Sequence, residues 1–133
     1  MGILLAPLAL ILFIIVFIIE TIFSLFFQTK NRKWFKIVSV RLHRKAKLID
    51  IFGNYLFPEF WNFIFSKKGV NYKYGRWAET ISSVTGKKRL EKSLSFTGLV
   101  LYYILYLIDF TSWKHGGHCI RWIQSEEEIK NFK

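Results

Sequence analysis

The segment KHGGHCIRW, residues 114 to 122, contains two histidines and the only cysteine of the chain within five positions. His115, His118 and Cys119 are zinc ligands by type, and Glu79 or Asp109 would have to supply a fourth ligand. Structural zinc sites usually combine two closely spaced cysteines with a second, distant pair. The two glycines between the histidines also disfavour a shared helix face for His115 and Cys119. A metal-dependent hydrolase built on these residues is therefore one hypothesis, and the spacing argues against it.

A structural role explains the same residues more simply. As a nucleophile, Cys119 would need a base placed by the fold, and on a helix the neighbouring His118 points about 100° away. We predict instead that Asp109 ends an apolar helix and that the glycines at 116–117 form a left-handed turn. Cys119 is then buried as a small apolar residue, and His118 bonds Glu79 or Asp109. The predicted polar clasp comprises Glu79, Asp109, His118 and Cys119, joins the ETISS segment to the C-terminal helix, and uses no metal or cofactor.

The N-terminal segment that precedes these residues is strongly apolar. Residues 3 to 27 contain one charge, Glu20, and would extend roughly 37 Å as a helix, against about 30 Å of bilayer hydrocarbon. A cleavable signal peptide would begin with positive charge, which is absent here. The pattern predicts a transmembrane helix over residues 1–28. Since basic residues follow it, the positive-inside rule predicts the N-terminus outside and residues 28–93 in the cytoplasm.

The basic residues concentrate after this segment. Residues 28 to 93 contain sixteen Lys or Arg against four acids, which gives a local charge of +12. Residues 29–50 are predicted to form an amphipathic helix with an apolar stripe and a basic remainder. Such a helix binds an anionic lipid surface; nucleic acid is the alternative partner and is not favoured, because no known aromatic and basic motif is present. The residues predicted to bind the membrane surface are Lys33, Lys36, Arg44 and Lys47.

Residues 51–133 are predicted to form a compact, aromatic-rich helical unit. Residues 77 to 85 are expected to form a short helix that Gly86 ends. Residues 93–108 have no charge and are too short for a standard span, so they form either a thin second span or a buried or half-inserted helix. Three consecutive glutamates, residues 126 to 128, are expected to open a last short helix.

Several short motifs follow one another along the chain: Asn62, Gly75, the ETISS run at 79–83, Ile108 with Asp109, His118 with Cys119, and Glu126 to Glu128. Their order resembles that in a group of small proteins encoded by tailed phages and prophages. The resemblance covers roughly residues 50–128 and implies a phage or prophage origin and a compact α-helical unit, without an activity. The chain departs from the group by its N-terminal apolar segment and basic helix.

These observations together predict an all-α, membrane-anchored protein of the integral class. The chain lacks a glycine-rich phosphate loop, a pair of histidines four residues apart beside a glutamate, and a Gly-x-Ser-x-Gly motif, so an enzyme is not expected. We expect a non-enzymatic phage-type protein that acts in or on the bilayer in lysis, in superinfection blocking or in a membrane-bearing particle. Its partners are anionic lipids and either other proteins or copies of itself. The alternatives are an accessory subunit of a larger membrane complex and the metal-dependent hydrolase.

Overall fold

The computed structural model describes residues 2–27 and 34–132; for residues 2–6, 8, 25–27 and 34–38 it describes the helix without the side chains. The fold is mostly helical. The described residues contain no strand, only an isolated antiparallel bridge between Ser66 and Leu94, so the prediction of an all-helical fold is confirmed. The chain divides into two compact units, Met1–Arg44 and Lys45–Lys133.

The first unit contains helix α1 (Gly2–Phe27) and the beginning of helix α2 (Trp34–Leu56). Apolar residues continue around every side of α1, which has Pro7 near its start. Thr21 donates its hydroxyl to the Phe17 carbonyl at 2.7 Å, which keeps this polar group bonded within its own helix. Most described side chains of α1 are exposed.

The predicted integral placement in a membrane is contradicted. Within the described residues, no helix offers a stretch long and apolar enough to cross a membrane. Helix α5 (Phe96–Ile108) has thirteen residues, about 20 Å of helix against about 30 Å of bilayer hydrocarbon. The expected span, the outside N-terminus and the cytoplasmic assignment of residues 28–93 are therefore withdrawn.

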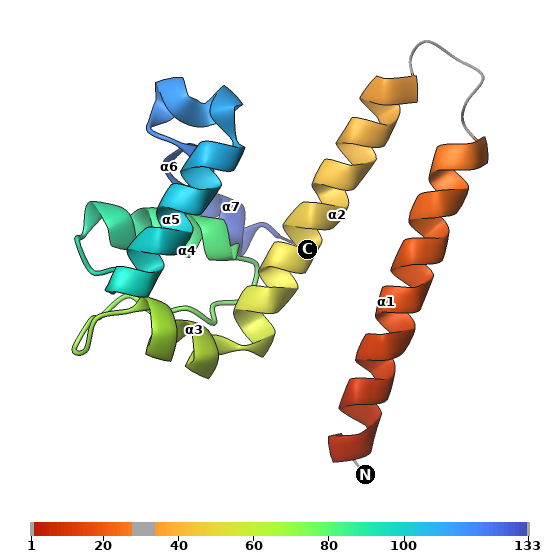
Figure 1. Cartoon of the computed structure of the whole chain (residues 1–133). Helices are drawn as coiled ribbons and strands as arrows, with labels where there is room; N and C mark the ends of the chain where they lie inside the picture. The colour runs from red at the N-terminus through yellow and green to blue at the C-terminus, as the bar shows by residue number, and fades with distance from the viewer. Residues whose placement is uncertain (1, 28–33, 133) are drawn as a thin grey trace. The chain divides into compact units, whose positions relative to one another are not determined.

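The second unit, residues 45–133, is built around α4 and α5. In Figure 1, α5 runs across α4, with α3 near its start. The start of α5 is fixed to the end of α3, because Ser95 donates its backbone N–H to the Phe65 carbonyl at 3.1 Å. The helices of this unit, besides the end of α2 and α5, are α3 (Pro58–Phe65), α4 (Ile81–Leu90), the 3-10 helix η1 (Phe110–His115), α6 (His118–Arg121) and α7 (Glu126–Lys130).

Helix α4 differs from its predicted bounds. It begins at Ile81, where the Thr80 hydroxyl accepts the Ser83 backbone N–H at 3.0 Å as an N-cap, and it continues through Gly86 to Leu90. Gly86 does not end the helix. A Cβ at this position would lie 2.3 Å from the Cys119 carbonyl oxygen, so glycine is needed for close packing between α4 and α6.

Other predicted boundaries agree with the structure. Asp109 follows the last residue of α5 as its C-cap, and Gly116 and Gly117 have φ values of 85° and 96°. The glutamates at 126–128 form the first turn of α7 after the N-cap Ser125. These features were predictable because caps and left-handed turns depend on local residue types.

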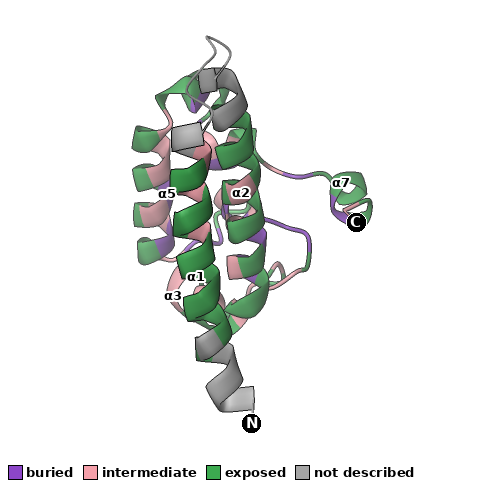
Figure 2. Ribbon diagram, turned by 90° about the vertical axis from the view of Figure 1, so that its right-hand side faces the viewer, coloured by how far each residue is buried: buried purple, intermediate pink, exposed green. Residues whose placement is uncertain are grey.

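The interior of the second unit is unusually polar. Figure 2 shows purple, buried segments within this unit, while much of α5 is green or pink. Buried polar residues are common inside folded proteins only where each group finds a hydrogen-bond partner. The buried apolar residues are Ile51, Tyr74, Ala78, Val84, Leu94, Tyr102, Cys119 and Ile129, and the buried polar ones are Asn54, Glu79, Thr80, Ser82, Ser83, Thr85, Lys88, Ser93, Ser112 and Gln124.

Candidate functional site

The loop between α3 and α4, residues 66–80, is held in place by two asparagine side chains. Asn54 donates to the carbonyls of Arg76 and Glu79 at 3.1 and 2.8 Å and accepts the Gly75 N–H at 3.0 Å. Asn62 exchanges hydrogen bonds with the backbone of Tyr74, at 3.0 and 2.9 Å. A primary amide can donate and accept at once, so these two side chains replace the backbone ladder that an irregular loop lacks.

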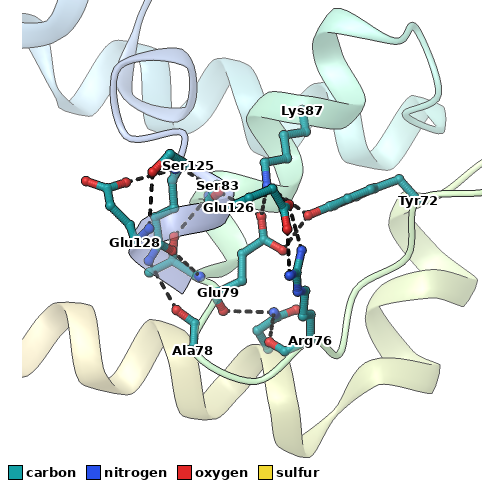
Figure 3. Close-up of polar contacts among 12 residues, drawn as sticks. Tyr72, Arg76, Ala78, Glu79, Ser83, Lys87, Ser125, Glu126 and Glu128 are labelled. Atoms are coloured by element: carbon teal, nitrogen blue, oxygen red, sulfur yellow. Dashed lines mark hydrogen bonds and ion pairs between the residues drawn. The ribbon is translucent and has the colours of Figure 1, made fainter. Parts of the chain in front are cut away.

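Glu79 is fully buried and lies at the centre of a polar cluster (Figure 3). Its carboxylate accepts the Tyr72 hydroxyl at 2.6 Å and the Ser83 hydroxyl at 2.8 Å. The Lys87 ammonium lies 2.7 Å from the same carboxylate. Burial alone would lower the pKa of Lys87, but its bonds to Glu79 and Tyr72 outweigh burial and raise this pKa. The cluster is a satisfied ion pair, the arrangement that a buried charge requires.

The C-terminal segment is joined to this cluster by two side chains. Arg76 forms a bidentate pair with Glu126, both distances being 2.7 Å. Gln124 accepts the Thr80 N–H at 2.8 Å and donates to the Ala78 carbonyl at 3.1 Å. Gln124 was not among the predicted residues, because a single glutamine in a polar stretch gives no sequence signal.

The members of the predicted clasp lie in two different places. His118 Nδ1 lies 2.8 Å from Asp109 Oδ2, and since an ionised carboxylate only accepts, the histidine donates. Hydrogen bonds from the hydroxyls of Ser112 and Thr111 hold the pKa of Asp109 well below its usual range, with a smaller contribution from His118. Glu79 belongs instead to the cluster with Tyr72, Ser83 and Lys87. It is Gln124, through the Ser83 hydroxyl at 3.0 Å, that ties the ETISS segment to the C-terminal segment.

Cys119 has the environment of a core residue. Its side chain is fully buried, and burial raises the pKa of the thiol to about 12. Because the thiolate is the reactive and metal-binding form, this thiol is a poor nucleophile and a poor ligand. Across residues 2–27 and 34–132, no three His, Cys, Asp or Glu side chains are grouped closely enough to hold a metal ion.

The predicted lipid-binding residues are only partly described. Lys33 lies outside the described residues, and Lys36 belongs to α2 but its side chain is not described. Arg44 and Lys47 are exposed on α2. Their binding to anionic lipid stays a prediction.

A surface that sequence reasoning did not identify as a site lies along α5. Six large apolar or aromatic side chains, each three or four positions from another, are all exposed. We call the surface that they form the outer face of α5. Leu107 and Ile108 are 67% and 69% exposed and Phe96 is 81% exposed. Residues three or four positions apart share one side of a helix, so the face is one continuous apolar stripe. Its members are Phe96, Val100, Tyr103, Ile104, Leu107 and Ile108.

Exposed aromatic residues also occur beyond the helix, in η1. Phe110 is 70% exposed, and Trp113 is exposed and stacks on Tyr106 with its ring centroid 6.0 Å away. The Trp113 indole donates to the Tyr106 carbonyl at 2.6 Å. The uncharged run at 93–108 predicted an apolar helix that is buried or inserted in a membrane. It could not show which side of that helix remains exposed.

Comparison of the chain with protein-family models, with curated proteins and with solved structures gave no match.

Proposed function

We propose that the chain is a non-enzymatic protein of phage or prophage origin that binds to the surface of an anionic bilayer and acts there. The second unit docks there through the outer face of α5. The observation that carries this proposal is that face itself. Docking onto a surface requires no membrane span.

The apolar character and the exposure of the outer face of α5 support docking. Soluble monomeric proteins rarely leave large contiguous apolar patches in water, and such patches usually mark binding sites. A helix with one apolar side lies in the plane of a lipid interface, with that side about 5–10 Å deep. The tyrosine and tryptophan at positions 103 and 113 are residue types that favour the headgroup level.

The charge of the second unit supports an anionic partner. Residues 45–133 contain fourteen Lys or Arg against eight Asp or Glu, a net charge of +6. Exposed Lys92 lies just before α5, and exposed Lys114 and Arg121 follow it in the chain. Each basic side chain near an anionic leaflet contributes on the order of 1 kcal/mol of attraction. Apolar and cationic contributions therefore favour the same surface.

Catalysis is less well supported by the same geometry. The buried carboxylate of Glu79 is already bonded by three side chains. The Cys119 thiol is buried with a raised pKa. Neither group is free to contact a substrate, whereas the outer face of α5 is exposed.

A fluorescent label on the full chain tests the proposal. An environment-sensitive dye is attached at Leu107→Cys on α5 and, as the matched control, at Glu127→Cys on α7; native Cys119 is buried and reacts slowly. With vesicles of phosphatidylcholine and phosphatidylglycerol, we expect the dye at 107 to shift to the blue and to be quenched by brominated acyl chains. The dye at 127 should remain in water. Because the label reports its own surroundings, binding by the apolar α1 does not imitate this result.

Two outcomes would contradict the proposal. A dye at 107 that stays in water on vesicles would show that α5 does not dock on lipid. A dye at 107 that is already shielded without lipid, together with an increased mass of the particle, would assign the outer face of α5 to another copy of the protein.

A further inference from the structure

Arg89, in the last turn of α4, lies beside the outer face of α5. Its guanidinium carbon is 5.3 Å from the ring centroid of Tyr102 and 5.9 Å from that of Tyr103. Its Nη2 donates to the Tyr103 hydroxyl at 3.4 Å. Contacts with two aromatic rings restrict a guanidinium without using many of its hydrogen-bond donors. Arg89 is therefore held in place, with most of its five N–H groups still available.

Arg89 differs from Arg76 in its lack of an acidic partner. Arg76 forms a bidentate pair with Glu126, whereas within the described part of the chain no carboxylate forms an ion pair with Arg89. Glu91 is exposed and two positions away, a spacing at which side chains on a helix do not face each other. The fork geometry that Arg76 uses for a carboxylate is thus unused at Arg89, and the same fork fits a phosphate.

The neighbours of Arg89 indicate where such a phosphate would come from. Tyr103 contacts Arg89 and is itself half-exposed in the outer face of α5. When that face lies at the level of the acyl chains, a group at its edge lies at the level of the headgroups. On a bilayer, the phosphate found at that level is the phosphate of a lipid headgroup.

We propose that Arg89 binds the phosphate of an acidic phospholipid headgroup through a bidentate contact, with Tyr102 and Tyr103 holding the guanidinium. This inference rests on the proposed docking of α5 on lipid. It adds a specific binding residue that lies outside the basic segment predicted from the sequence. A purely structural stacking of Arg89 on the two tyrosines is the alternative.

The test uses the full chain labelled at Leu107→Cys and the blue-shifted fraction of the dye as the measure of docking. The variants are Arg89→Gln, Arg89→Lys and, as a control for the loss of one exposed charge, Lys92→Gln. On phosphatidylglycerol vesicles, Lys92→Gln should lower the docking constant about fivefold, as expected for one charge. Arg89→Gln should lower it about thirtyfold, because the fork is lost together with the charge. Arg89→Lys keeps the charge and should still lose about fivefold.

Equal docking by Arg89→Lys and the parent protein, or equal losses for Arg89→Gln and Lys92→Gln, would overturn the proposal. Circular dichroism of each variant checks that the helices are retained. A second arm is independent of docking: glycerol phosphate in solution should shift the NMR signal of the Arg89 side-chain N–H. That shift without insertion of the dye at 107 would keep the phosphate site and reject the lipid surface. An unshifted Arg89 signal would overturn the site even if the dye inserts.

Discussion

The second unit has polar side chains where most small domains have apolar ones, and apolar side chains where most have polar ones. Around Glu79, charged and amide groups are buried and bonded to one another, whereas along α5 large apolar residues face outward. The polar interior therefore stabilises the unit, and a different part, the outer face of α5, is available for binding. Hydrogen bonds and one buried ion pair hold the loop to α4, and the apolar surface that folding leaves unburied remains available for a partner.

The largest expected effect is on the polar interior. Glu79→Ala removes the acceptor of Tyr72, Ser83 and Lys87 and should lower the free energy of unfolding by about 3 kcal/mol, because a buried network loses its central charge. Urea denaturation measures this change. Glu127→Ala, at an exposed position of α7, is the control and should change stability by less than about 0.5 kcal/mol. Equal stability of the two variants would show that the Glu79 cluster does not hold the unit together.

The second largest expected effect concerns the close packing of α4 against α6, which stabilises the unit in addition to the polar network. Gly86→Ala places a methyl group against the Cys119 carbonyl oxygen. Overpacking costs about 1–3 kcal/mol, and a 2.3 Å contact with a backbone oxygen places this substitution at the upper end of that range. The higher helix propensity of alanine offsets about 1 kcal/mol, so we expect a net loss of about 2 kcal/mol.

Gly53→Ala is the matched control for this substitution. Gly53 is also inside a helix, but its added Cβ would lie 3.2 Å from a flexible side-chain end, Ile81 Cδ1. It should be close to neutral, because a side-chain end can move where a backbone carbonyl cannot. A stable Gly86→Ala protein would indicate that α6 can shift away from α4, and that the polar contacts alone determine the fold.

Part of the fold could be predicted from the sequence, and part could not. Helices α5 and α7 and the turn at Gly116 were predictable, because apolar periodicity, caps and left-handed glycines are local signals. The prediction that Gly86 ends a helix was wrong. In the sequence, a glycine that lets α4 approach Cys119, 33 positions later, looks the same as a glycine that ends a helix. The irregular loop 66–80 has no periodicity at all.

The candidate site was predictable to a smaller extent. The sequence placed His118 with either Glu79 or Asp109, and only three-dimensional packing assigns Glu79 to Lys87. The roles of Asn54 and Gln124 depend on backbone groups of a distant loop, which no residue pattern reveals. The exposed side of α5 likewise depends on which of its faces packs against α4 and α6.

The smallest expected effect concerns the Asp109 and His118 pair, at the end of α5 where the polar and apolar parts of the unit meet. The folded pKa of Asp109 is depressed, so its contribution to stability is present above the unfolded carboxyl pKa near 4 and is lost as the pH falls. Asp109→Asn should therefore cost about 1 kcal/mol at neutral pH. The difference in unfolding free energy from the parent protein should shrink steadily below about pH 4. Urea denaturation of both proteins, repeated between neutral pH and the lowest pH at which they stay folded, measures this difference.

A difference that does not depend on pH would contradict this prediction. It would mean that the contacts of Asp109 with Ser112, Thr111 and His118 do not stabilise its ionised form. Asp109 would then stabilise the end of α5 only as a polar group at its C-cap, and not through its negative charge.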